Sequence, residues 1–380
     1  MRIGIEAQRI FRKEKHGMDM MAVELIKNLQ KLDLINEYFI FVNPDEDNAT
    51  IRPSANFTIV PLKKSLYPIW EQHFLAKAVK EYKLDILHCT SNTAPLNLDI
   101  PLILTLHDII YLEKMDWKSG SWYQRLGNLY RRWNVPLIVK KATKILTVSK
   151  FEEKRIRNHF GLASGKVVVV YNGIAKHFQL LDEETAEAGR EKLKLPPEYV
   201  LFLGNTDPKK NLYGMIKALK KLHEQGELTI DCVITDLQEE VLLSMLKELD
   251  AEAIQERIHL TGYVRNKDMP FLYSNALFFL YISLRESFGL PILEAMACGC
   301  PVITSNTSSM PEIAGDAAVL VDPTDEHAIS TAIKNLTEDE AMRQELKRKG
   351  LARPLSFSYK TRVKRIIDIY HKVYQQAYEQ

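Results

Sequence analysis

Two glutamates that lie eight positions apart, Glu286 and Glu294, flank Gly289. An apolar, strand-like run ends near Ile282, and a helical pattern begins near Gly289–Leu290. Glycine at this junction lets the backbone approach a ligand closely, and N–H groups at a helix start favour anionic phosphate oxygens. Glu294 then lies about one turn inside the helix, where its carboxylate is able to accept both hydrogen bonds of a ribose diol. Spacing alone favours the ordinary interpretation, a surface glutamate pair beside a helix start.

A second loop with chemical potential, 203–212, follows another strand-like run. It contains Gly204 and the adjacent cations Lys209 and Lys210. This composition suits a loop that grips a diphosphate, because lysine offers a compact positive charge. A solvated lysine pair on a turn is the alternative, and for an isolated pair it is the preferred one.

Two loops in the first half carry weaker signals. His107, followed by Asp108, ends an apolar run, where a histidine can hydrogen-bond a sugar hydroxyl or a developing charge, although single histidines are more often structural. In 15–25 a loop containing Gly17 enters a helix. Asp19 would repel a phosphate there, so we interpret it as a helix cap or a contact to the acceptor.

The elements that position these loops are predicted by the hydrophobic pattern. Short apolar, β-branched runs alternate with longer helical patterns, which indicates an α/β fold with parallel sheets. Such sheets bind ligands beyond the carboxyl ends of their strands, and the main candidate loops follow strands. The expected strands are 2–7, 38–42, 85–89, 102–106, 144–148 and 167–171 in the first half, and 199–203, 231–235, 257–261, 276–282, 301–304 and 318–321 in the second.

A chain of 380 residues is ordinarily divided into two domains. A polar stretch, 175–197, is the expected linker. The expected domains are 1–175 and 196–355, and 356–380 is expected to contain a helix that packs back toward the first domain. Two parallel sheets that face each other form a cleft, where the site is expected.

Composition excludes several classes of function. The net charge of +2, from 51 basic and 49 acidic residues, argues against nucleic-acid binding. No apolar run approaches the roughly 18 residues of a membrane span, and the first residues do not resemble a signal peptide. No Gly-x-Gly-x-x-Gly follows a first strand, which argues against a dinucleotide dehydrogenase. Four scattered cysteines without zinc-site or disulfide spacing indicate a reduced, cytoplasmic setting: Cys89, Cys232, Cys298 and Cys300.

The segment 281–323 resembles the donor-binding half of glycosyltransferase family 4, including its Glu-x7-Glu motif at Glu286 and Glu294. Residues 305–312 and 315–318 belong to the resembling segment, and weaker resemblance extends from the first strand to the final helix. The resemblance implies the GT-B fold, two Rossmann-like domains with parallel sheets facing across a cleft. It overturns the ordinary interpretation of the two glutamates.

The resemblance also implies residue roles. Lys210 matches a diphosphate-binding lysine, Glu286 a carboxylate near the sugar hydroxyls, and His107 a histidine that contacts the transferred sugar, so these three are the expected catalytic residues. Many relatives have arginine where this chain has Asn205 and Lys209, and a second glycine where it has Asp19. The implied donor-binding residues are Gly17, Gly204, Lys209, Lys210, Val264, Phe288, Gly289, Leu290 and Glu294.

The expected reaction is transfer of a hexosyl group, such as mannose or glucose, with retention of configuration. The donor is a nucleotide diphosphate sugar, and the acceptor is a hydroxyl of a glycan or lipid-linked molecule in polysaccharide synthesis. No metal or further cofactor is expected, because the lysines and the amides near 288–290 supply the positive charge. The alternatives are a nucleotide-sugar 2-epimerase of the same fold, which the Glu-x7-Glu context fits poorly, and a non-catalytic nucleotide-sugar-binding protein.

The stretch 117–144 mixes aromatic and basic residues, among them Trp117, Tyr130 and Trp133. One interpretation is contact with an anionic membrane surface, at the inner face of the membrane, or with a lipid-linked acceptor. The other is an amphipathic helix with its aromatic residues on the core side. The second is favoured, because the charges do not occupy one clean face.

Overall fold

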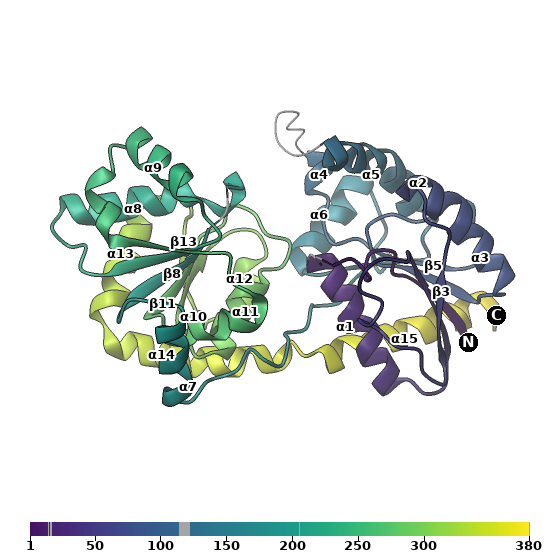
Figure 1. Cartoon of the computed structure of the whole chain (residues 1–380). Coiled ribbons are helices and arrows are strands. Elements are labelled where there is room, and N and C mark those ends of the chain that lie inside the picture. The colour runs from purple at the N-terminus through teal and green to yellow at the C-terminus, as the bar shows by residue number, and fades with distance from the viewer. Residues whose placement is uncertain (14, 16, 114–121, 205, 380) are drawn as a thin grey trace. The chain divides into compact units, whose positions relative to one another are not determined.

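The chain folds into two compact units, each built on one parallel sheet. A computed structural model (Figure 1) describes all residues except 14, 16, 114–121, 205 and 380. Unit 1 comprises Met1–Gly173 and Tyr359–Gln380, and unit 2 comprises Ile174–Ser358. The sheet of unit 1 has the order β3-β2-β1-β4-β5-β6-β7, and that of unit 2 has the order β10-β9-β8-β11-β12-β13. The α/β class predicted from the alternating pattern is confirmed.

Strands of unit 1 alternate their side chains between two apolar layers. In β2, Tyr38 and Ile40 pack with α1 and α15, whereas Phe39 and Phe41 join the layer of α3, α5 and α6. A sheet covered by helices on both faces requires apolar residues at every strand position, as these runs have. The elements are β1 (Arg2–Glu6), α1 (Gly17–Leu32), β2 (Glu37–Val42), β3 (Phe57–Pro61), α2 (Tyr67–Ile69), the π-helical turn η1 (Trp70–Leu75), α3 (Ala76–Glu81), β4 (Ile86–Cys89), β5 (Leu102–Thr105), α4 (Ile110–Glu113), α5 (Trp122–Lys141), β6 (Lys144–Thr147), α6 (Lys150–Phe160), β7 (Val167–Val169) and α15 (Tyr359–Tyr378).

The C-terminal helix α15 belongs to unit 1 and lies beside α1 (Figure 1). Its Tyr370 hydroxyl lies 2.6 Å from Nδ1 of His88, whose Nε2 lies 2.8 Å from Oγ1 of Thr105. Burial lowers the pKa of His88 to about 3, so the ring is neutral at physiological pH. A neutral histidine between two hydroxyls attaches the helix to β4 and β5 without burying a charge.

Unit 2 includes the polar stretch that the sequence marks as a linker. Residues 183–192 form α7, which packs on α10 so closely that a Cβ on Gly189 would lie 2.3 Å from Phe271. The chain passes between the units at 173/174 and again at 358/359, where Ile174 and Ser358 form a parallel bridge. The sequence expected a linker at 175–197 instead. A Glu- and Lys-rich helix such as α7 needs only one small face to pack on α10, so its polar composition does not exclude it from unit 2.

The elements of unit 2 are α7 (Glu183–Lys192), β8 (Tyr199–Leu203), η2 (Pro208–Lys210), α8 (Leu212–Glu224), β9 (Asp231–Thr235), α9 (Glu239–Glu248), η3 (Glu252–Arg257), β10 (Ile258–Gly262), η4 (Asn266–Asp268), α10 (Met269–Asn275), β11 (Phe278–Tyr281), α11 (Leu290–Ala297), β12 (Val302–Ser305), α12 (Met310–Ala314), β13 (Val319–Val321), α13 (Glu326–Glu338), α14 (Glu340–Ala352) and η5 (Arg353–Ser356). No helix in the described parts of the chain combines the length and apolar content needed to cross a bilayer.

A buried carboxyl in η1 connects three parts of unit 1. Glu71 accepts hydrogen bonds from the hydroxyls of Tyr67 (2.7 Å), Thr93 (2.6 Å) and Tyr130 (2.5 Å), so it joins α2, the loop after β4, and α5. Gln72 donates a further bond at 3.0 Å. Burial raises the pKa of Glu71 to about 7, although these hydroxyl donors act in the opposite direction.

The helix α5 lies within the aromatic and basic stretch 117–144. Its core side carries buried Val135 and Ile138, and the Tyr130 hydroxyl binds Glu71. The sequence interpretation that put the aromatic residues on the core side is confirmed for Tyr130 and wrong for Trp133, which is 53% exposed, whereas Trp117 lies outside the described residues.

Replacing Glu71 should therefore change how the stability of unit 1 depends on pH. A carboxyl whose pKa is higher in the folded than in the unfolded state stabilises the protein below the unfolded pKa, and this stabilisation is lost as pH rises from about 4.5 to about 7. We expect Glu71→Gln to remove between about 1 and 3 kcal/mol of this pH dependence, measured by denaturant unfolding at pH 5 and pH 8. Glu37→Gln, at an exposed carboxyl of the same unit, is the control. An unchanged pH dependence in Glu71→Gln would contradict the proposed cause.

Candidate active site

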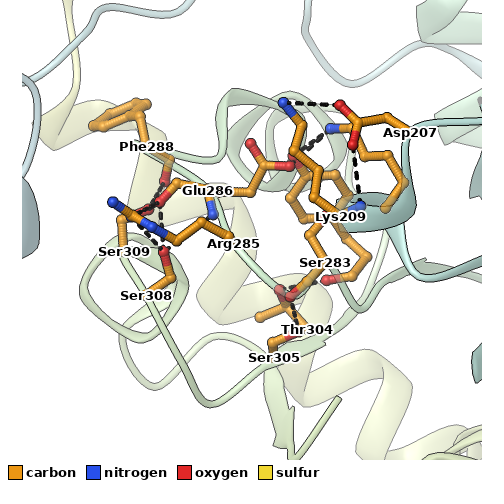
Figure 2. A network of polar contacts seen from close by, with 12 residues as sticks. Asp207, Lys209, Ser283, Arg285, Glu286, Phe288, Thr304, Ser305, Ser308 and Ser309 are labelled. Atoms are coloured by element: carbon orange, nitrogen blue, oxygen red, sulfur yellow. Dashed lines mark hydrogen bonds and ion pairs between the residues drawn. The ribbon is translucent and has the colours of Figure 1, made fainter. Parts of the chain in front are cut away.

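The candidate residues of unit 2 gather at the carboxyl ends of three neighbouring strands. Lys209 and Lys210 follow β8, Glu286 follows β11, and Ser308 follows β12. Because β11 pairs in parallel with both β8 and β12, these loops leave the sheet at the same edge (Figure 2). The sequence prediction that the loops after the strands form one site is consistent with this arrangement.

Lys210 and Glu286 form an ion pair at this edge. The Nζ atom of Lys210 lies 2.8 Å from Oε1 of Glu286 and 3.3 Å from the hydroxyl of Tyr281, and it lies 5.1 Å from the centre of the Tyr281 ring. The Lys210 and Glu286 side chains are 17% and 14% exposed. Burial and the Glu286 charge raise the pKa of Tyr281 well above its usual value, so its hydroxyl stays protonated. The result is a partly desolvated cation held by a carboxylate, where electrostatic interactions are stronger than in water.

The two adjacent lysines have different ion-pair partners. Lys209 pairs with Asp207 at 3.3 Å and has a side chain that is 40% exposed, and among the described contacts none joins it to the Glu286 side chain. Its carbonyl oxygen accepts a 2.7 Å hydrogen bond from the Leu284 amide, so its backbone joins the β8 loop to the β11 loop. Figure 2 shows Lys209 turned toward Asp207. Asn205, the other departure in this loop, lies outside the described residues.

Three serines fix the backbone of the loop that carries Glu286. The Ser308 hydroxyl accepts from the Glu286 amide at 3.0 Å and donates to the Glu286 carbonyl at 2.5 Å. Ser309 donates to the carbonyls of Glu286 (3.0 Å) and Phe288 (2.9 Å), and Ser305 donates to that of Ser283 (2.7 Å) (Figure 2). Sequence reasoning did not name these serines as site residues, although they lie within the segment that resembles the family.

The start of α11 has the geometry of an anion-binding helix end. Gly289 precedes the helix with φ of +98°, a conformation that side-chain-bearing residues rarely adopt. The first N–H groups of a helix lack intrahelical acceptors, which leaves the amides around Leu290 for a ligand. The Phe288 ring is buried against Phe357 at 5.9 Å. Any ligand contact of Phe288 is therefore made by its backbone.

Glu294 lies inside α11 and is half-buried. Its Oε2 accepts a long hydrogen bond, 3.4 Å, from the Tyr273 hydroxyl. Burial raises the pKa of Glu294 to about 7, with the Tyr273 bond acting in the opposite direction. A carboxyl that has a raised pKa and one long hydrogen bond, inside the helix that begins beside the Lys210–Glu286 pair, is typical of a ligand-binding group.

Two further predicted donor-binding residues have different surroundings. A Cβ on Gly204 would lie 2.5 Å from Cγ2 of Ile234 and 2.7 Å from the Thr235 carbonyl oxygen, so packing of β8 against β9 alone requires glycine there. Val264 is half-buried in the loop after β10, which is two strands away from β8 in the sheet. Among the described contacts, none joins Val264 to the Lys210–Glu286 pair.

The predicted sugar-contacting histidine belongs to unit 1. His107 is buried, its amide donates to Oδ1 of Asn92 at 2.8 Å, and its Nε2 lies 3.1 Å from the Thr90 carbonyl oxygen. Burial, then the charge of Arg362, lowers the pKa of His107 to about 4, so the ring is neutral near pH 7. Because Nε2 faces a carbonyl oxygen, it donates its proton there, and Nδ1 is left as an acceptor.

The loop before α1 differs from its sequence interpretation. Asp19 lies within the first turn of α1, is buried, and pairs with Arg9 at 3.7 Å, so it is not the helix cap that one of the two interpretations expected. The other interpretation, a contact to the acceptor, stays a prediction. A buried acidic side chain is tolerated there because the guanidinium compensates its charge. Gly17 is the first residue of α1, and a Cβ added to it would meet no atom within 4 Å.

In comparisons with known proteins, each of the two units matches a family model. Residues 184–353 match the model of glycosyl transferases group 1, and residues 16–177 match that of glycosyltransferase family 4. The chain is 27% identical over 372 residues to O-antigen chain mannosyltransferase B of Escherichia coli, which covers 93% of this chain and 95% of that protein. It is 28% identical to O-antigen chain mannosyltransferase RfbU of Salmonella typhimurium, over 77% of this chain and 75% of the relative.

Solved structures share the fold over the whole chain. Sucrose-phosphate synthase from Thermosynechococcus elongatus superposes with a TM-score of 0.75 at 17% identity, covering 99% of this chain and 100% of that one. HepE of Anabaena, solved in complex with UDP and glucose, gives a TM-score of 0.72 at 18% identity, covering 98% and 100%. The fold is GT-B, as the resemblance implied. With both units matched, the chain is a glycosyltransferase that belongs to the group 1 and family 4 enzymes.

Proposed function

We propose that this glycosyltransferase moves a mannosyl or related hexosyl group, with retention, from a nucleotide diphosphate sugar to a hydroxyl of a lipid-linked polysaccharide. The relatives named as O-antigen mannosyltransferases support the sugar and the type of product. The observation that carries the proposal is the Lys210–Glu286 pair beside the start of α11. It supplies a fixed positive charge and a carboxylate at one place.

In the proposed mechanism the sugar–diphosphate bond breaks while the acceptor oxygen forms its bond on the same face of the anomeric carbon. The leaving phosphate oxygen takes the proton of the acceptor hydroxyl, so no side chain becomes glycosylated. Lys210 and the amides of Gly289 and Leu290 stabilise the negative charge that develops on the diphosphate, in place of a metal ion. A covalent sugar adduct on Glu286 would exclude this mechanism.

Three further residues have proposed roles. Glu286 accepts hydrogen bonds from sugar hydroxyls, and Glu294 accepts them from the ribose diol. Neutral His107 contacts the transferred sugar through Nδ1, since its Nε2 faces the Thr90 carbonyl. Gly17, Gly204, Lys209 and Val264 stay predicted donor contacts.

The proposed function is tested by a donor screen with the purified protein in EDTA. UDP-, GDP-, ADP- and dTDP-sugars, including GDP-mannose, are compared by thermal shift and by slow hydrolysis of the donor. We expect one donor to raise the melting temperature and to be hydrolysed without added metal. Conversion of a donor to its 2-epimer would instead indicate the epimerase, and binding without hydrolysis, also when lipid-linked acceptor is added, the non-catalytic alternative.

The two adjacent lysines should differ in their effect on catalysis. We expect Lys210→Met to lower kcat by about 100- to 1000-fold, because it removes a fixed charge beside the leaving group. Lys209→Met should change kcat less than about 10-fold, because this exposed side chain pairs with Asp207. Both variants are first compared with the wild type by thermal melting, since Lys210→Met leaves the Glu286 charge uncompensated. Equal losses would contradict the distinction that the geometry draws.

Glu294 should act on donor binding rather than on chemistry. Loss of hydrogen bonds to a charged group costs about 1.5–3 kcal/mol, so Glu294→Ala should raise KM for the donor roughly 10- to 150-fold and leave kcat within a few fold. Tyr273→Phe is the matched control, because it removes only the 3.4 Å bond to Glu294 and should have little effect. A fall in kcat with unchanged KM would mean that Glu294 is not a ribose ligand.

A further inference from the structure

A guanidinium in the first turn of α15 is buried inside unit 1. Arg362 is 7% exposed, and its Nη1 donates to the thioether sulfur of Met21 in α1 at 3.2 Å. Its Nε is buried and has no hydrogen-bond partner. Because a thioether sulfur is a weak, uncharged acceptor, the described contacts leave most of the hydrogen-bonding capacity of this guanidinium unused.

No acidic side chain among the described residues compensates the Arg362 charge. Burial lowers the pKa of Arg362, and the groups that act in the opposite direction are the tyrosines Tyr359 and Tyr370 of the same helix. The buried carboxylate of α1, Asp19, pairs with Arg9 instead. Arginine stays protonated in proteins, and a buried charge is ordinarily paired because desolvation is costly. The exception at Arg362 therefore requires an explanation.

Arg362 lies beside the predicted sugar-contacting residue. Its charge contributes, after burial, to the lowered pKa values of both His88 and His107, so the guanidinium is near both rings. His107 follows β5, and its amide donates to Asn92, which follows β4. The carboxyl ends of parallel strands are where such sheets bind ligands, so the buried cation is placed at the binding edge of unit 1.

A structural arginine of the same chain shows the contrast. Arg353 in unit 2 donates from Nε to the Ile313 carbonyl at 2.8 Å and from Nη2 to the Glu312 carbonyl at 2.7 Å. Its hydrogen-bonding capacity is used by the backbone that it holds in place. Arg362 has no such acceptors among the described residues, although it is buried.

We propose that Arg362 binds a phosphate group of a substrate at the carboxyl edge of the unit 1 sheet. The guanidinium presents a planar fork of N–H groups that matches phosphate oxygens, and it is weakly hydrated, which suits a buried anion site. A bound phosphate neutralises the charge and accepts the hydrogen bonds that the Met21 sulfur leaves unused. The C-terminal helix, which attaches to β4 and β5 through Tyr370, then contributes directly to substrate binding.

Two substrates can supply this phosphate, and only this choice rests on the proposed function. One source is the diphosphate of the nucleotide-sugar donor, and the other is the phosphate of a lipid-linked acceptor. In the proposed mechanism Lys210 serves the donor diphosphate from unit 2. Arg362 gives unit 1 a phosphate-binding cation of its own.

The first test uses the full chain without either substrate. Arg362→Met should melt at or above the wild-type temperature in phosphate-free buffer, because it removes an uncompensated buried charge and keeps an apolar side chain. Inorganic pyrophosphate, titrated by calorimetry in EDTA, should bind at one site fewer in Arg362→Met than in the wild type. Arg365→Met, at an exposed position of the same helix, is the matched control and should behave as the wild type in both measurements.

The proposal is overturned if Arg362→Met melts below the wild type, because the guanidinium then stabilises the fold itself. It is also overturned if wild type and variant bind the same number of pyrophosphate ions. Neither measurement depends on transferase activity, so a failure of the proposed function is recognised separately in the donor screen.

The second test identifies the source of the phosphate by steady-state kinetics. Arg362→Met should raise KM at least about 10-fold for the substrate that carries the phosphate. A rise for the donor indicates the donor diphosphate. A rise for a lipid-diphosphate acceptor that is absent with the same glycan lacking phosphate indicates the acceptor. Unchanged KM values for donor and acceptor would exclude a phosphate contact of Arg362 in catalysis and overturn the proposal.

Discussion

Parallel strands all end at the same edge of their sheet, and the chemistry of this enzyme depends on that constraint. Lysine from the loop after β8 meets glutamate from the loop after β11, 76 positions later in the chain, only because the two strands pair in parallel register. The helix that follows β11 then begins at the same edge and directs its first amides there. The fold brings a cation, a carboxylate and a helix end together before any ligand arrives.

Preorganisation at this edge comes from the backbone more than from the charged side chains. Ser308 and Ser309 use their hydroxyls to satisfy the amide and carbonyl of Glu286, and the Ser305 hydroxyl donates to the Ser283 carbonyl. These bonds replace the sheet and helix partners that a loop lacks. Small hydroxyl residues are suited to this because they bond to the backbone without filling the space a ligand needs. Fixed dipoles of this kind stabilise developing charge without reorganisation.

The sequence predicted most strands because doubly covered parallel strands are continuous apolar runs, which few other elements resemble. It missed β3, an edge strand in which Thr58 and Pro61 are exposed, so that the strand is not a continuous apolar run. It also placed a linker where α7 packs on α10, because composition reports polarity and not the single small face that Gly189 provides. Within the candidate site, the sequence named Lys210, Glu286 and Glu294, but it could not tell which of two adjacent lysines faces the Glu286 carboxylate. That choice depends on the turn η2, whose geometry the Asp207 cap sets.

Two carboxyls in this chain have their pKa raised to about 7 for the same reason, yet their surroundings suit different tasks. Glu71 receives three hydroxyl bonds of 2.7 Å or less from separate elements, so its hydrogen-bonding capacity is spent on holding η1, α5 and the β4 loop together. Glu294 receives one bond of 3.4 Å from Tyr273 and is only half-buried. A desolvated carboxyl whose acceptor capacity is largely unspent is costly unless something else satisfies it, and a ligand with two neighbouring hydroxyls does so. The raised pKa therefore marks both residues as unusual, and the count of good hydrogen bonds separates the structural carboxyl from the one available for binding.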